Sequence, residues 1–146
     1  MGTIVRKSLF FELTTSRTGS ALYFETDKDC LVDSCEFIGC SSTSGSNGGA
    51  VLMIGNVVIE TFSLFDRCKG WCSSALMENG ITRNFVNGTT CVNCENKGYH
   101  TVTQWRADSI AFNCNISLCS CSIHAPGLQS FNGPKYHYTY ISLWSN

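Results

Sequence analysis

A chain of 146 residues can bury one core, and its apolar content of 43% and aromatic content of 12% exclude intrinsic disorder. Charged residues make up 14% and the net charge is −1, so the chain lacks the basic field that nucleic acid or an anionic membrane would require. Thirteen glycines against two prolines, with abundant Val, Ile, Thr and Phe, favour strands and turns over helices.

Two kinds of short segment alternate along the chain and predict a repeat. Segments of the first kind occupy residues 8–13, 35–40, 63–68, 89–94, 116–121 and 141–146. Segments of the second kind occupy residues 19–24, 48–53, 73–78, 100–105 and 127–131. Both kinds keep one period of 25–29 residues. A shared period of this length indicates a solenoid, here a right-handed parallel β-helix of five to six coils.

Recurring positions within these segments predict the core. Three residues before each end of the first kind stand apolar residues: Phe10, Phe37, Phe65, Cys91, Leu118 and Leu143. Five before it stand small or apolar residues: Ser8, Cys35, Ser63, Thr89, Ile116 and Ile141. Nine before it, five of six are apolar: Ile4, Leu31, Ile59, Phe85, Phe112 and His137. Because strands alternate their faces, we expect the first two sets inside together and the third inside across a bend.

The fold prediction is therefore all-β, with residues 1–146 forming one β-helix domain. A β-trefoil or a small sandwich is the alternative for a strand-rich chain of this length. A trefoil would show three repeats of roughly 45–50 residues. The sequence shows no such period, which favours the solenoid.

The segment Gly48–Val51, with the sequence GGAV, alternates with the FxxC segments Phe37–Cys40 and Phe65–Cys68. This pairing resembles the GGA(I/V) and FxxN repeats of polymorphic outer-membrane proteins, and it is similar to related β-helix proteins of protists. Cys stands in four of six segments where that family has Asn. The wider pectin-lyase-like class shares the solenoid and contains both enzymes and binding proteins, so the resemblance implies the fold and leaves the activity open.

The ten cysteines follow the repeat. Four of them, Cys40, Cys68, Cys94 and Cys121, end a segment of the first kind and are expected to stack as buried thiols. Disulfides between neighbouring coils are an alternative, although flat stacking places Cβ atoms slightly too far apart. A structural zinc is a further alternative, because Cys91–Cys94 and Cys68–Cys72 have ligand-like spacing. Since the repeat already explains one member of each pair, no metal and no cofactor are expected.

Candidate site residues are few. Tyr136, Tyr138 and Tyr140 alternate along one strand and would form an aromatic platform for sugar rings or a protein partner; an ordinary terminal strand is the alternative. Asn87 and Asn115 begin glycosylation sequons if the protein is secreted. Asn115 is the better acceptor, because Asn87 shares the parity of Phe85, which is expected inside.

Catalysis is not supported by the sequence. The acidic stretch from Glu25 to Asp33 lacks the spacing of a calcium loop and is expected to be a solvated turn. No column places two carboxylates in neighbouring coils beside a basic residue, as polysaccharide cleavage would require. We therefore expect a non-catalytic module of a surface or secreted protein that contacts carbohydrate or protein through its flank. The alternative is a diverged pectin-lyase-like enzyme whose catalytic coils lie elsewhere.

Two features bear on partners and location. The segment Met1–Arg6 has no apolar signal-peptide region, so the sequence leaves the localisation open. Neither end of the predicted solenoid shows a cap, and uncapped solenoid ends expose unpaired strand backbone. We expect further coils of a parent chain, or end-to-end association of copies, to cover those ends.

Overall fold

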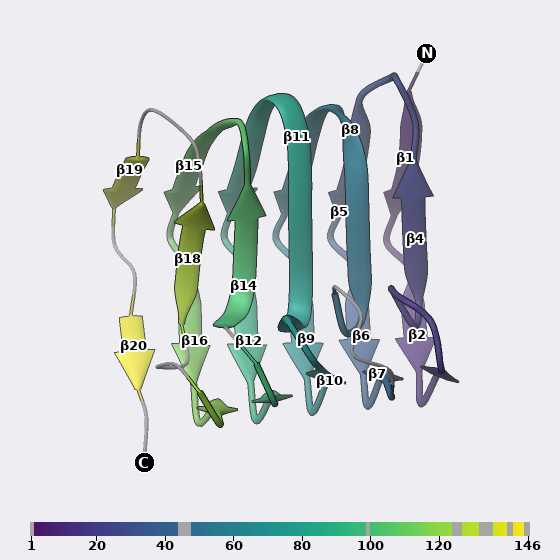
Figure 1. Cartoon of the computed structure of the whole chain (residues 1–146), viewed down its shortest axis with the longest axis vertical. Helices are drawn as coiled ribbons and strands as arrows, with labels where there is room; N and C mark the ends of the chain where they lie inside the picture. Colours follow the sequence, from purple (N-terminus) through teal and green to yellow (C-terminus); the bar gives the residue numbers. More distant parts are fainter. Residues whose placement is uncertain are drawn as a thin grey trace.

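The structure is a computed structural model that describes residues 2–43, 48–98, 100–123, 127–131, 136–139 and 142–144, with the backbone alone for residue 131 and the last two ranges. The described residues form strands and connections, and no helix among them is long and apolar enough to cross a membrane. The strands pair in parallel and stack as a β-helix of about five turns (Figure 1). The predicted fold class is confirmed.

Three parallel sheets form the walls of the β-helix. The long sheet contains β1 (Thr3–Arg6), β4 (Leu22–Glu25), β5 (Cys30–Asp33), β8 (Val51–Thr61), β11 (Ser73–Asn87), β14 (His100–Trp105), β15 (Asp108–Phe112), β18 (Leu128–Phe131) and β19 (Tyr136–Thr139). The middle sheet contains β2 (Leu9–Phe11), β6 (Glu36–Ile38), β9 (Leu64–Asp66), β12 (Thr90–Val92), β16 (Asn115–Ser117) and β20 (Ser142–Trp144). The short sheet contains β3 (Thr14–Thr15), β7 (Ser41–Ser42), β10 (Lys69–Gly70), β13 (Glu95–Asn96) and β17 (Ser120–Cys121).

The long sheet supplies two walls. In Figure 1, β8 and β11 rise along one wall, bend over the top and descend along the opposite wall. The register between β8 and β11 shifts between Gly80 and Arg83, where this bend lies. We call the descending part, formed by β1, β5, the second halves of β8 and β11, and β15, the back wall. The chain then enters the middle sheet and the short sheet before it rises again.

The predicted aromatic column is present in the core. The ring of Phe37 is fully buried and stacks on the rings of Phe10 and Phe65, at centroid distances of 4.9 and 4.7 Å and interplanar angles of 5° and 9°. Cys91 pairs with Phe65 and continues the column. This stacking distance equals the spacing of about 4.8 Å between parallel strands, so register alone brings the rings together.

The column prediction is wrong by two residues in the fifth coil. Ile116 pairs with Cys91 and is buried, whereas Leu118 is 45% exposed. Likewise Cys119, rather than Cys121, lies beside Cys94, since the Cys119 thiol reaches the Cys91 carbonyl as the Cys94 thiol reaches that of Phe65. A shift of two preserves the alternation of a strand, so the pattern of apolar residues does not reveal it.

The predicted alignment of the second kind of segment is wrong by one residue between the third and fourth coils. Ala21 and Ala50 bond in register as predicted, but Val102 pairs with Leu76 rather than with Ala75. The cause is an irregularity in β11 between Ser73 and Leu76, where the strand carries one extra residue relative to β14.

The column nine residues before each segment end faces outward, which corrects a prediction. Ile4 is 51% exposed, and Leu31 and Ile59 are half-buried. The inner positions of the back wall are the alternate ones, including Val32 and Val58, which are fully buried. The fifth member is Ile110 rather than Phe112, because Phe85 pairs with Ile110.

Left-handed corners explain this reversal of parity. Two residues per coil have φ between 47° and 71°, one on each side of the middle sheet. The first set is Lys7, Ser34, Phe62, Gly88 and Asn113, and the second is Glu12, Gly39, Arg67, Asn93 and Leu118. A left-handed residue adds one position to the alternation of side chains. Inward residues are therefore three positions apart across each corner, whereas they are two apart within a strand.

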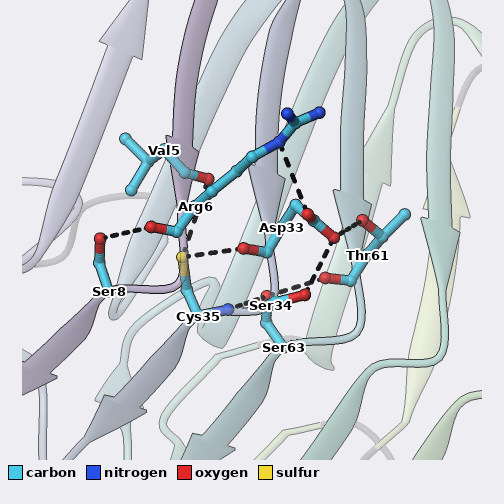
Figure 2. Close-up of polar contacts among 8 residues, drawn as sticks. All are labelled: Val5, Arg6, Ser8, Asp33, Ser34, Cys35, Thr61 and Ser63. Atoms are coloured by element: carbon cyan, nitrogen blue, oxygen red, sulfur yellow. Dashed lines mark hydrogen bonds and ion pairs between the residues drawn. The ribbon is translucent and has the colours of Figure 1, made fainter.

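The residue after the first corner of each coil is small and polar: Ser8, Cys35, Ser63, Thr89 and Cys114. Figure 2 shows the first corner, where the Ser8 hydroxyl donates to the Arg6 carbonyl at 2.8 Å and the Cys35 thiol donates to the Asp33 carbonyl at 3.4 Å. The Ser63 hydroxyl donates to its own coil in the same way, at 3.1 Å. Ser and Cys are therefore equivalent here, because each satisfies the carbonyl two residues earlier, whereas the Thr89 hydroxyl donates to Glu60.

The GGA sequence is required by close backbone approach. Gly48 has φ of 71°, and a Cβ added to Gly49 would lie 2.0 Å from the Ser74 carbonyl oxygen. We expect Gly49→Ala to lower the free energy of unfolding by at least about 1–3 kcal/mol, because backbone of the next coil must move. The matched control is Ser74→Ala, whose hydroxyl is buried without a partner in the described chain. Equal urea midpoints for the two variants would contradict this expectation.

Candidate functional site

The short sheet carries a polar outer face. Each of its strands has two residues, and the first residue of each strand faces outward: Thr14, Ser41, Lys69, Glu95 and Ser120. Thr43, Trp71 and Lys97 follow two residues later in the same register, as shown by the amide of Lys97 donating to the Gly70 carbonyl at 3.2 Å. We call these eight residues the polar face. The pattern places hydroxyl, ammonium and indole groups side by side along three or more coils.

A hollow of about 180 Å³ lies in the middle of the polar face. It is lined by Ser41, Ser42, Thr43, Lys69, Gly70, Trp71, Glu95 and Lys97. Trp71 is 41% exposed, so part of its ring is available to a ligand. The Trp71 carbonyl accepts the Gly98 amide at 2.7 Å, and a Cβ added to Gly98 would lie 3.5 Å from Cδ1 of the indole. The next coil therefore fixes the position of Trp71.

Charges in the hollow are partly neutralised. Nζ of Lys69 lies 2.8 Å from Oε2 of Glu95. The hydrogen bond from Lys69, together with the charges of Lys69 and Lys97, lowers the pKa of Glu95 below its usual range. Among the described residues of the lining Glu95 is the single carboxylate, and Lys69 pairs with it. The described lining therefore holds no second carboxylate of the kind that glycosidases use as a pair.

Two carboxylates lie in the interior, and sequence reasoning missed them. Glu60 and Glu78 are both fully buried. Burial raises the pKa of Glu60 to about 7, although Thr89 and Ser63 donate hydrogen bonds that oppose the shift. Burial also raises the pKa of Glu78 well above its usual range, against a hydrogen bond of 2.9 Å from Gln104. Without access to solvent these groups cannot act on a ligand at the surface.

Cys40, Cys68 and Cys94 are buried in one corner column as predicted, and Cys119 takes the place predicted for Cys121. All ten cysteines are in described parts of the chain, and each is in the thiol form. In the second corner the Cys68 thiol reaches the Phe37 carbonyl of the preceding coil at 3.3 Å, and Cys94 reaches that of Phe65 at 3.5 Å. Burial raises the pKa of Cys114 to about 12, which keeps that thiol protonated and able to donate. Among the described residues no group of three or more His, Cys, Asp or Glu is placed to hold a metal ion.

The predicted tyrosine platform falls on the last strands. The backbone of Tyr136 pairs with Ser109 and that of Tyr138 with Ala111, two positions that are fully buried. Tyr140 lies outside the described residues. The structure does not join these tyrosines to the hollow around Trp71, so the platform stays a prediction.

The two sequons lie on different walls. Asn115 is exposed on β16, beside the buried Ile116. Asn87 was expected to share an inward parity with Phe85, but both are half-buried on the outer side of β11. The Asn87 side-chain oxygen accepts from Asn113 at 3.1 Å. Glycosylation at either position remains a prediction.

Only residues 26–29 of the acidic stretch form the predicted turn, because Glu25 ends β4 and Cys30–Asp33 form β5. Asp27 pairs with Lys28 at 3.0 Å, and both are exposed. Oδ1 of Asp29 accepts the Val57 amide of the next coil at 3.2 Å. Asp33 accepts from Thr61 at 2.7 Å and lies 3.6 Å from Arg6, as Figure 2 shows. Asp29 and Asp33 therefore tie neighbouring coils together, whereas Asp27 pairs within its own turn.

Comparisons with known proteins add no relative. No protein-family model matches the chain, and no curated protein or solved structure matches it significantly. The function must therefore be inferred from the geometry of the molecule.

Proposed function

We propose that this chain is a non-catalytic β-helix module of a surface or secreted repeat protein that contacts carbohydrate through its polar face. The exposed ring of Trp71 beside the hydroxyls of Ser41 and Thr43 is the observation that carries the proposal. Sugar rings stack on indole through their apolar faces and bond hydroxyl groups at their edges. A protein partner could contact the same groups. If the polar face bound a protein and no sugar, a protein would be its ligand instead of carbohydrate.

The resemblance in the repeats supports the same class of protein. Gly48 and Gly49 of the GGAV sequence occupy a positive-φ turn and a close backbone approach. The FxxC segments supply the stacked Phe column and the corner thiol. These requirements support a relation to polymorphic outer-membrane-like and pectin-lyase-like repeat proteins, some of which act as surface modules.

The ends of the β-helix bear on its partners. The strands β1, β2 and β3 are each the first member of their sheet, and Phe10 in the first coil is only partly buried. We infer that another coil of the same kind, from a parent chain or a second copy, covers this edge. Such a coil would continue the backbone pairing and the aromatic column.

Trp71→Ala tests the proposed binding. We expect the wild-type chain to bind members of an array of neutral and acidic oligosaccharides. Trp71→Ala should weaken binding of the best ligand, measured by calorimetry, about five- to thirtyfold, since stacking on the indole contributes about 1–2 kcal/mol. The control is Phe11→Ala, which removes an exposed ring from the middle sheet. Equal binding by both variants would contradict the site, and shortening of the oligosaccharides would favour the enzyme alternative.

A further inference from the structure

The back wall presents an apolar column to the outside. Its members are Ile4, Leu31, Ile59, Phe85 and Ile110, which pair across five consecutive coils. The ring of Phe112 lies beside that of Phe85, with centroids 6.0 Å apart. Parallel sheets are normally covered on both faces, so an apolar outer column calls for a covering partner. This wall is separate from the polar face, and its role does not depend on the proposed function.

Polar residues, interrupted by Val57 and Phe112, border the apolar column on both sides. Two residues before it along each strand stand Asp29, Val57, Arg83 and Asp108, from the second to the fifth coil. Two residues after it stand Arg6, Asp33, Thr61, Asn87 and Phe112, from the first to the fifth coil. Asp29, Arg83 and Arg6 are exposed. An apolar centre with a charged rim is the anatomy of a protein–protein interface.

The column and its borders are complementary to the same residues taken in the opposite order of coils. Consider a second copy laid face to face, related by a two-fold axis that runs parallel to the strands through the third coil. Ile59 then meets Ile59, Leu31 meets Phe85, and Ile4 meets Ile110. In the upper border Asp29 of one copy lies opposite Arg83 of the other. In the lower border Asp33 lies opposite Asn87, and Arg6 lies opposite the Phe112 ring, a cation–π arrangement.

We propose that the back wall pairs with a second copy of this chain in a two-fold dimer centred on Ile59, because its apolar column and its Asp29 and Arg83 charges match when the coil order is reversed. An isologous contact of this kind closes at two copies. The face is five strands wide, at a spacing of about 4.8 Å, and five residues high, at about 3.3 Å per residue. Its area is therefore on the order of 400 Å². That area is below the standard size, so the dimer dissociates on dilution.

Sedimentation velocity over a wide range of protein concentration, in reducing buffer, tests the proposal. We expect a monomer–dimer equilibrium for the whole chain. Arg83→Asp places a carboxylate opposite Asp29 twice per dimer, and we expect it to weaken association at least about tenfold. Adding Asp29→Arg to Arg83→Asp restores opposite charges across the axis and should restore association. Since Asp29 also bonds Val57 within its own chain, thermal melts must first show that the double variant is folded.

Ile59→Thr provides an independent test, because it keeps a β-branched residue and removes apolar contact at the axis. We expect it also to weaken association at least about tenfold. Leu64→Thr, at a half-buried outer position of the middle sheet, is the matched control and should leave the dimer unchanged. A chain that stays monomeric, or association that is indifferent to both Arg83→Asp and Ile59→Thr, would overturn the proposal.

Discussion

Phe37→Ala is expected to lower the free energy of unfolding by about 3–5 kcal/mol. The Phe37 ring has no exposed surface, and it stacks between Phe10 and Phe65 at 4.9 and 4.7 Å. Truncation removes both stacking contacts and leaves a cavity that neighbouring coils cannot fill, because their positions are fixed by backbone pairing along three sheets.

Equilibrium unfolding in urea measures this loss. The control is Phe11→Ala in the neighbouring coil, since Phe11 is 55% exposed on the outer side of the middle sheet. The control should lose no more than a small fraction of the effect. A loss below about 1 kcal/mol for Phe37→Ala would show that the aromatic column does not support the fold.

Stability is expected to fall as the pH rises from about 4.5 to about 7, because of Glu60. The pKa of Glu60 is raised from 4.5 to about 7, so the folded chain holds its proton where the unfolded chain has lost it. The favourable contribution is complete below the unfolded pKa and is lost as the pH rises to the folded value. A shift of this size corresponds to about 3 kcal/mol. Glu78, whose pKa is also raised, acts in the same direction.

Glu60→Gln isolates the contribution of Glu60. The amide cannot ionise, so the wild-type chain should lose about 2 kcal/mol relative to this variant between pH 5 and pH 7. The altered hydrogen bonds to Ser63 and Thr89 add an offset that does not change with pH. Urea unfolding at several pH values gives the comparison, with Glu36→Gln as the control at an exposed carboxylate. Parallel curves for wild type and Glu60→Gln would refute the assignment.

The repeat period, the all-β class and the Phe10–Phe37–Phe65 column could be predicted from the sequence. Each of these depends on the spacing of like residues along the chain, and parallel stacking converts equal spacing directly into contact. The thiols of the corners followed from the same period. The pattern did not explain why thiols occur at the corners. The structure shows that each corner thiol donates a hydrogen bond to the carbonyl two residues earlier.

The tertiary structure alone decided which side of the back wall faces the core. Each left-handed corner adds one position, and neither Ser34 nor Phe62 carries a sequence signal for it, so Ile59 was expected inside although Glu60 is the buried residue. The hollow around Trp71 was also hidden, because two-residue strands are too short to alternate, and its lining comes from three coils. Local spacing thus determined the stacking of the coils, whereas the backbone conformation at the corners determined the direction of the side chains.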